Sequence, residues 1–341
     1  MGIVGARLRI GTLIGCVVAS WLTGTTAQAQ QQQAQTAAKP PAARAQAPAA
    51  APLVRENTTR KIAPHTWVIP DNSVPFVPNV GIVVGSRATL VIDPGLGVRN
   101  AQAVLREVAK ISKNGEMYVV TTHFHPEHAA GVAAFPVSAK YIVSQVQQKD
   151  LDELAPAMAA QFAKRTPLMG ELLKNATFRK ADISFDKQYE LDLGGVKVTL
   201  MAMGPTHTRG DTVAWVQDEK AGVIFAGDVI MNQTIVAYSQ YSSTKAWMDA
   251  LAQLARLRPA EQEDAAIVVP SHGAVGNSNL IAYERGFFQG IQARVRELKE
   301  QGKPEPEILM SVTDEFKGRY AMWNATDRIV AIVGNVYQEM R

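Results

Sequence analysis

The stretch "VVTTHFHPEHAAG", residues 119–131, contains three of the chain's six histidines and a glutamate within six positions. It overlaps "MYVVTT" (117–122), a short run of apolar and β-branched residues that predicts a strand. In extended backbone, side chains two positions apart share a face, so His123 and His125 point to one side. That geometry suits nitrogen ligands of a metal ion, and a turn brings His128 within reach of a neighbouring ion. We therefore predict a metal site here.

Three more predicted strands end at residues that can bind a metal. The run "VKVTLMAM" leads into the loop "GPTHTRGD" with His207, "GVIFAG" is followed by Asp228, and "AIVVP" is followed by "SHG" with His272. Loops at the carboxyl edge of a sheet are where layered folds build their sites. A carboxylate offsets metal charge and can bridge two ions, so we interpret Asp228 as a ligand. His65 lies outside every motif, and we interpret it as a structural histidine.

Strands and helices alternate along the domain, which predicts a layered α/β fold with helices covering sheet. The hairpin "YELDLGGVKVTLMAM" (189–203) turns at Gly194-Gly195. A helical insertion from Gln145 to Lys174 is expected to form a wall of the pocket. The other predicted strands lie at 66–70, 80–85, 88–93, 139–144, 212–216, 222–227 and 266–270, and helices are predicted at 100–112, 145–164, 244–257, 279–300 and 326–340.

The N-terminus has the three parts of a secretory signal: two early arginines, an uncharged apolar run from Ile10 to Leu22, and small residues ending at Ala29. A run of about 13 residues is too short to cross a bilayer, which takes roughly 20. We therefore expect cleavage after Ala29 and a periplasmic or secreted protein with no integral membrane segment after cleavage. An alternative interpretation treats "LIGC" as a lipoprotein signal with a lipid on Cys16.

The composition divides the chain into a signal peptide (1–29), a disordered linker rich in Gln, Ala and Pro (30–53) and one large domain (54–341). Cys16 is the only cysteine, so the expected mature chain has no disulfide, no cysteine nucleophile and no cysteine-based zinc site. The formal net charge is +4 and there is no basic cluster, which gives no case for nucleic-acid binding. A small-molecule substrate is the expected partner.

The histidine motifs carry a resemblance to a known family. "HFHPEH" resembles the HxHxDH signature of the metallo-β-lactamase superfamily, and "GPTHTRGDT" is similar to its second histidine loop. "FAGDVI" is similar to its bridging-aspartate strand and "SHG" to its last histidine motif. Order and spacing agree from the "LVIDPG" turn near Asp93 to His272. The resemblance implies a four-layer αββα sandwich with two zinc ions at one edge of its sheets.

By position, the resemblance also implies a role for each ligand. His123, His125 and His207 would hold the first ion, His128 and His272 the second, with Asp228 bridging them. Glu127 departs from the family pattern, which has aspartate there. It would ligate the second ion with a shifted position, or act beside it as a general acid or base, or leave a weakened second site.

Two ions in such a site imply hydrolysis by a metal-bridging hydroxide, because paired ions lower the pKa of a shared water to about 7. The metals would also stabilise the oxyanion that develops. Zinc suits these ligands, although iron or manganese would fit them as well. Substrate identity, metal identity and oligomeric state are not encoded in any motif.

The residue at position 228 narrows the expected substrate. β-Lactam hydrolases of this superfamily resemble one another in having cysteine or serine there, whereas the "GD" form is similar to that of thioester hydrolases, lactonases, sulfatases and dehalogenases. We therefore expect ester, thioester or lactone hydrolysis. The alternatives are β-lactam or sulfate-ester hydrolysis, dehalogenation, and a non-catalytic periplasmic metal-binding accessory protein. Tyr238, Tyr241 and Trp247 are candidate substrate contacts or core residues.

Overall fold

The computed structural model describes residues 51–218, 222–257 and 266–340, which all lie within one compact unit, Pro48–Arg341. The predicted signal peptide and the linker up to residue 50 lie outside the described residues. Of the helices that the structure describes, none is both long and apolar enough to cross a membrane.

The first sheet has seven strands in the order β1 to β7. Its first four strands are antiparallel, and β4 to β7 run parallel, with Ile92 beside Val120 in the β4–β5 pair. The strands are β1 (Arg60–Ala63), β2 (Thr66–Ile69), β3 (Val80–Val84), β4 (Ala88–Ile92), β5 (Glu116–Val120), β6 (Lys140–Ser144) and β7 (Ile183–Phe185).

The second sheet has six strands in the order β13-β12-β11-β10-β9-β8, and only β11 and β12 pair in parallel. Gly194 and Gly195 make the β8–β9 turn with φ values of 86° and 83°, which fits the predicted hairpin. The strands are β8 (Gln188–Asp192), β9 (Lys197–Ala202), β10 (Thr212–Gln217), β11 (Val223–Phe225), β12 (Ile267–Val269) and β13 (Gly276–Asn277).

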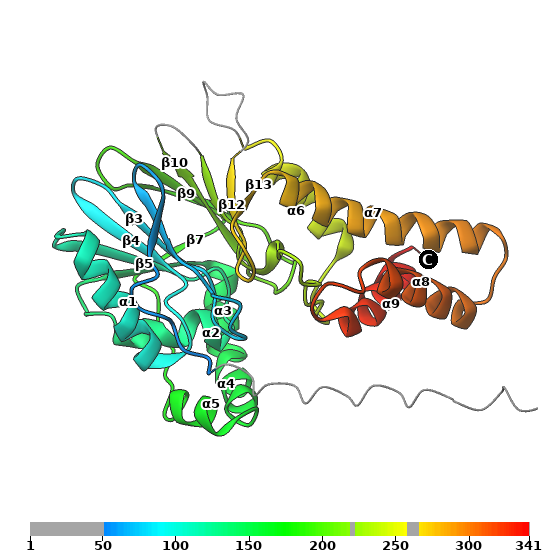
Figure 1. The fold of residues 1–341 in the computed structure, drawn as a ribbon, viewed down its shortest axis with the longest axis horizontal. Helices are drawn as coiled ribbons and strands as arrows, with labels where there is room; N and C mark the ends of the chain where they lie inside the picture. Colours follow the sequence, from blue (N-terminus) through cyan, green and yellow to red (C-terminus); the bar gives the residue numbers. More distant parts are fainter. Residues whose placement is uncertain (1–50, 219–221, 258–265, 341) are drawn as a thin grey trace, which may run out of the picture. The chain divides into compact units, whose positions relative to one another are not determined.

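Helices cover the outer face of each sheet, as Figure 1 shows. The helices are α1 (Gly97–Ile111), α2 (Pro126–Ala129), α3 (Gln145–Glu153), α4 (Ala155–Ala163), α5 (Pro167–Leu172), α6 (Thr244–Leu254), α7 (Asn279–Glu300), α8 (Glu305–Arg319) and α9 (Ile329–Glu339), with short 3-10 turns η1 (Ala130–Ala134), η2 (Gly227–Val229) and η3 (Thr326–Arg328).

Alternation along the strands explains the layers. In β4 and β5, Leu90 and Val120 pack between the two sheets, whereas Val91 and Val119 pack on the other face against the α1 side. The outer face of the second sheet packs against helices α6 to α9, and together they form a separate hydrophobic cluster. Helix, sheet, sheet and helix therefore follow one another, and the predicted αββα sandwich is confirmed.

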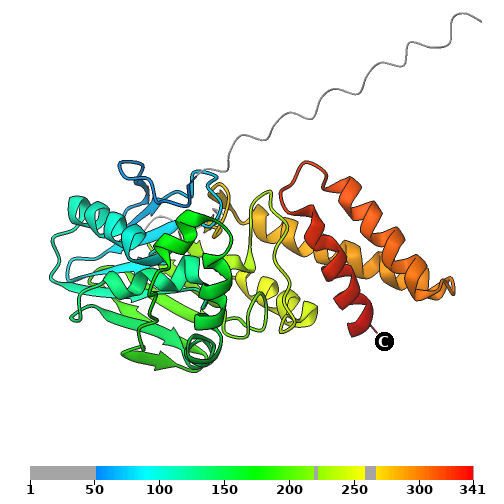
Figure 2. The ribbon, with the colours of Figure 1, turned by 90° about the horizontal axis from the view of Figure 1, so that it is seen from below.

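The structure differs from the predicted elements in two ways. The single helix predicted at 145–164 is two helices, because Pro156 has no N–H to continue the first and instead sits in the first turn of α4. Among the strands and α-helices of the described residues, five were not predicted: β1, β7, β13, α2 and α8. Figure 2 shows α8 and α9 beside α7, and α8 buries Ile308, Val312 and Phe316 at helical spacing.

Candidate metal centre

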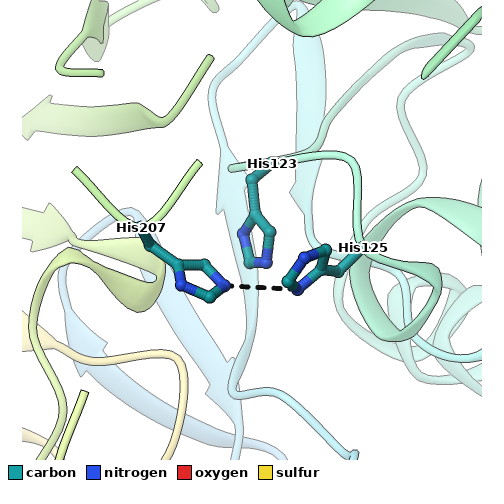
Figure 3. Close-up of side chains that lie close together, drawn as sticks. All are labelled: His123, His125 and His207. Atoms are coloured by element: carbon teal, nitrogen blue, oxygen red, sulfur yellow. Dashed lines mark hydrogen bonds between the residues drawn. The ribbon is translucent and has the colours of Figure 1, made fainter. Parts of the chain in front are cut away.

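His123 and His125 follow β5 at the carboxyl edge of the first sheet, and His207 reaches them from the loop between β9 and β10. Figure 3 shows the three rings converging. His125 Nδ1 lies 3.2 Å from His207 Nε2, and the candidate ligand atoms of all three lie within 4.8 Å of one another. The sequence prediction that these three histidines come together is therefore reproduced by the geometry.

Asp211 shapes the loop that presents His207. Its carboxylate accepts the Thr208 backbone N–H at 2.8 Å, the Thr208 hydroxyl at 2.6 Å and the Thr206 hydroxyl. His207 Nδ1 lies 2.7 Å from the carbonyl oxygen of Ala237, which only accepts, so Nδ1 carries the proton. The lone pair of Nε2 is then left for a metal ion, as in sites where the other ring nitrogen orients the ligand.

Asp228 lies in η2, at the centre of the cluster. Its Oδ2 is 3.5 Å from His207 Nε2, and its Oδ1 is 3.7 Å from His128 Nε2 and 4.0 Å from His272 Nε2. Burial opposes ionisation of Asp228, but the charges of the surrounding histidines hold its pKa well below the ordinary value. An ionised carboxylate between two groups of imidazoles is the arrangement that a bridging ligand needs.

Asp93, at the end of β4, holds His128 in place. The carboxylate accepts the Thr122 backbone N–H at 2.7 Å and the Thr122 hydroxyl at 2.9 Å, and its Oδ2 lies 3.0 Å from His128 Nδ1. Although burial lowers the pKa of His128, the Asp93 carboxylate raises it to about 9. From the sequence, Asp93 was placed only in the "LVIDPG" turn where the family resemblance begins, and it was not predicted to contact a ligand. Its position in "LVIDPG", directly after a buried strand, was the available signal.

Glu127 and His272 complete the second group. Candidate ligand atoms of Glu127, His128 and His272 lie within 4.8 Å of one another. Glu127 lies in the first turn of α2 and is 5% exposed, and burial raises the pKa of its carboxyl group. The Glu127 carboxylate therefore lies beside the second group of histidines, at the position where the family pattern has the shorter aspartate.

The buried polar atoms fit a metal. Within the described residues, five atoms of the cluster are buried without a hydrogen-bond partner: His123 Nε2, Glu127 Oε2, His128 Nδ1, His128 Nε2 and Asp228 Oδ1. Of these, His128 Nδ1 has the Asp93 carboxylate as an ion-pair neighbour, which leaves the other four to face a metal. Leaving such atoms unpaired is costly, so native structures rarely do so unless another group is bound there. A donor set of imidazole nitrogen and carboxylate oxygen suits zinc, iron or manganese.

The three aromatic candidates for substrate contact have different placements. Trp247 is fully buried in the core and donates from Nε1 to the Val229 carbonyl at 2.9 Å, which argues against a substrate contact. Tyr238 stacks on Trp247, and its hydroxyl contacts Thr244 at 2.8 Å and Glu339 at 3.2 Å, so it serves the helical layer. Tyr241 is half-buried beneath the Arg209 guanidinium and remains a candidate.

The remaining histidine lies outside the cluster. His65 lies directly before β2, and its Nδ1 is 2.9 Å from the carbonyl oxygen of Val84 in β3. Its backbone N–H donates to Asp218 at 2.7 Å. This placement agrees with its interpretation as a structural residue.

The sequence matches the family described as "Metallo-beta-lactamase superfamily" over residues 74–272, which is more than half of the chain. The match includes every residue of the metal cluster. It confirms the resemblance carried by the histidine motifs.

Two similar proteins are named for hydrolytic reactions. The human acyl-coenzyme A thioesterase MBLAC2 is 25% identical over 191 residues, covering 52% of this chain and 67% of that protein. The linear primary-alkylsulfatase of Pseudomonas sp. (strain ATCC 19151) is 23% identical over 218 residues, covering 56% of this chain and 40% of that protein. The solved structure of the sec-alkylsulfatase Pisa1 from Pseudomonas sp. shares the fold, with a TM-score of 0.61 and 15% identity over 82% of this chain and 50% of that chain.

Proposed function

Because the chain belongs to the metallo-beta-lactamase superfamily, we propose that it is a hydrolase that cleaves ester or thioester bonds with two zinc ions bound. One observation carries this proposal: the Asp228 carboxylate lies between the two groups of imidazoles, with each of its oxygens within 4.0 Å of at least one ring nitrogen. A carboxylate in that position can hold two ions at once and offset their charge.

The residues divide between the two ions as the geometry groups them. His123, His125 and His207 would hold the first ion, and Glu127, His128 and His272 the second. A third group, His123, His128 and Asp228, links the two, so Asp228 would be shared. When bound, a pair of divalent ions activates water as a nucleophile and polarises the bond to be cleaved.

The chain's own residues would orient the ligands and move the proton. The Ala237 carbonyl and the Asp93 carboxylate hold the rings of His207 and His128 by their outer nitrogens. Burial raises the pKa of Glu127, which favours a carboxyl group that can accept or release a proton near the leaving group. Glu127 would then act in proton transfer as well as in metal binding.

Two observations support the substrate class. The chain has aspartate at position 228 rather than the cysteine or serine of β-lactam hydrolases, and it is similar to a thioesterase over half of its length. A second candidate is hydrolysis of sulfate esters, which the similarity to an alkylsulfatase favours.

Metal content and turnover test the proposal together. Purified protein is analysed for bound metal and assayed with thioesters, aryl esters, lactones, alkyl sulfates and a chromogenic β-lactam. His123→Ala is the test variant, and His65→Gln, which changes a histidine outside the cluster, is the matched control. We expect two zinc ions and thioester or ester turnover that His123→Ala abolishes and His65→Gln preserves.

Other outcomes contradict the proposal in different ways. Bound zinc without turnover of any substrate would favour the metal-binding accessory protein. Turnover that survives His123→Ala would contradict the metal-dependent mechanism. Turnover of the alkyl sulfate alone would favour the second candidate.

We also propose that the protein is exported, on the basis of its N-terminal pattern. The test is cell fractionation followed by N-terminal sequencing of the recovered protein. A periplasmic or secreted chain beginning at Gln30 is the expected result. A membrane-bound chain beginning at Cys16 would favour the lipoprotein alternative, and a cytoplasmic chain beginning at Met1 would contradict export.

A further inference from the structure

Arg165 lies within the helical insertion that reaches the metal cluster, between α4 and α5. It follows α4, and its backbone N–H donates to the Phe162 carbonyl at 3.0 Å. The Phe162 ring lies 6.2 Å, centroid to centroid, from the imidazole of His125, and α4 also packs against α2, as Figure 1 shows. The insertion therefore places Arg165 beside the first group of ligands.

Two aromatic rings hold the guanidinium of Arg165. Its Cζ atom lies 4.3 Å from the centre of the Phe162 ring and 4.9 Å from the centre of the Phe76 ring, and the two rings meet edge to face at 5.5 Å. Stacking on aromatic faces orients the guanidinium and leaves its N–H groups free to donate at the edge. The head group is therefore held in place before any ligand arrives.

The backbone of Phe76 is strained in a way that serves this contact. Phe76 has a φ of 61°, a left-handed conformation that is rare for a bulky residue and costs about 1–3 kcal/mol. Such outliers persist where the surrounding structure imposes them, and they cluster at sites that clamp ligands. Here the strained residue sits between Pro75 and Pro78 and directs its ring towards Phe162 and Arg165.

The loop that carries Phe76 spans the metal cluster. At its base, Asp71 accepts the Gly273 backbone N–H at 2.7 Å, and the Asn79 side chain donates to the Pro270 and Gly273 carbonyls, both at 2.8 Å. These contacts fix the base beside His272. The tip touches Phe162, which neighbours His125 at the other end of the cluster, so Arg165 and Phe76 belong to the rim of the site.

The ion pairs of the described residues leave the charge of Arg165 without a partner. Within the described part of the chain, no carboxylate forms an ion pair with it, whereas Arg209 on the His207 loop pairs with both Asp150 and Glu153. Arg165 is also exposed to solvent.

We infer that Arg165 is a substrate-binding residue that receives an anionic group, a carboxylate or a phosphate, of an ester or thioester whose scissile bond lies at the metal ligands. The inference rests on the proposed function and narrows its substrate class to anionic molecules. A planar guanidinium suits this role, because it can donate two parallel hydrogen bonds to a carboxylate or phosphate.

The test compares matched pairs of substrates. 4-Nitrophenyl hemiglutarate is paired with neutral 4-nitrophenyl valerate, and acetyl-coenzyme A with neutral S-acetyl-N-acetylcysteamine. For each pair, the ratio of kcat/KM for the anionic to the neutral substrate is measured in the unchanged protein, in Arg165→Gln, in Arg165→Lys and in Lys164→Gln. Lys164→Gln is the control, because it removes an exposed positive charge from the neighbouring position.

We expect Arg165→Gln to lower the ratio about tenfold, through KM rather than kcat, because a charge-assisted hydrogen bond to the substrate is lost. Arg165→Lys should restore part of the ratio, and Lys164→Gln should leave it as it is. The pair whose ratio falls identifies the anionic group as carboxylate or phosphate. A ratio that Arg165→Gln leaves unchanged in both pairs would overturn the inference.

A binding measurement separates this inference from the proposed function. Glutarate and inorganic phosphate are titrated calorimetrically into the metal-free protein and into Arg165→Gln. Binding that Arg165→Gln weakens about tenfold supports the role of Arg165, even if the protein cleaves none of the esters and the proposed function fails. Binding that is absent or insensitive to Arg165 overturns the inference, even if turnover is found.

Discussion

His128 Nδ1 lies 3.0 Å from Oδ2 of Asp93, and the side chains of both residues are almost completely buried. The contact fixes the orientation of the imidazole, so that its other nitrogen faces Asp228. Asp93 directly follows β4, and His128 lies in α2, which follows the neighbouring parallel strand β5, so these two segments build one half of the metal centre together.

Asp93→Asn is expected to weaken binding of the ion held by His128 by about 10–100-fold, which is the usual effect of removing a partner that orients a metal ligand. Metal titration of the chelated protein measures the affinity. Asp186→Asn, at an exposed position, is the control and should bind metal like the unchanged protein. Equal metal affinity in Asp93→Asn would show that His128 needs no orienting partner.

Glu127→Asp tests how the second ion is held. The shorter arm withdraws the carboxylate from the group that it forms with His128 and His272, so we expect about tenfold weaker binding of one ion and intact binding of the other. Equilibrium dialysis followed by metal analysis gives the stoichiometry. Glu190→Asp, on the exposed side of β8, is the matched control. Unchanged stoichiometry and an unchanged pH optimum would remove Glu127 from the ligand set.

Gly227→Ala is expected to destabilise the protein by about 1–3 kcal/mol and to reduce turnover. Gly227 has a φ of 56°, and an added Cβ would lie 2.7 Å from Cβ of Thr122, so Asp228 would move. Urea unfolding and activity are measured together. Gly318→Ala, in α8 where nothing lies within 4 Å, should instead stabilise by about 0.5–1 kcal/mol. Equal effects in the two variants would contradict the steric argument.

Metal removal should lower the thermal stability. The cluster buries ligand atoms that have no hydrogen-bond partner in the described structure, so bound ions would stabilise the folded state over the unfolded chain. We expect a chelator to lower Tm by roughly 5–15 °C and zinc to restore it. Calcium, which prefers oxygen ligands, is the control and should not restore it. A Tm that does not respond to chelation would contradict a resident metal.

Glu284 should make stability depend on pH. It is 3% exposed in α7, and burial raises the pKa of its carboxyl group from its ordinary 4.5 to about 8. Between these values the folded protein binds more protons than the unfolded chain. The free energy of unfolding should therefore fall as the pH rises, by up to about 1.4 kcal/mol per pH unit. The contribution of Glu284 is fully present below pH 4.5 and is lost as the pH rises through about 8.

Glu284→Gln removes this dependence. Urea unfolding from pH 5 to 9 should give a flatter profile for Glu284→Gln than for the unchanged protein, with the largest gain in stability at high pH. Glu300→Gln, at an exposed position on the same helix, is the control and should keep the original slope. Parallel profiles for Glu284→Gln and the unchanged protein would show that the buried carboxyl does not titrate as inferred.

The candidate ligands were predictable because each lies in the segment that follows a strand. Strand periodicity is a local property, and the side chains that follow buried strands gather at the carboxyl edge of a layered fold. His123, His207 and Asp228 could therefore be placed together from their positions alone. Trp247 shows the limit of this reasoning, because an aromatic residue near a site has the same local pattern whether it touches the substrate or, as here, fills the core.

The sequence by itself determined the kinds of ligand and their order along the chain, and its periodicity predicted a layered α/β fold. The four-layer sandwich was implied by the resemblance of the motifs to the superfamily. Only the tertiary structure decided which atoms meet: Asp93 with His128, Asp228 between both groups, and Arg165 against Phe76. These pairs come from separate segments of the chain, and their contact depends on how helices and loops pack over the sheet edge. No local pattern encodes that packing.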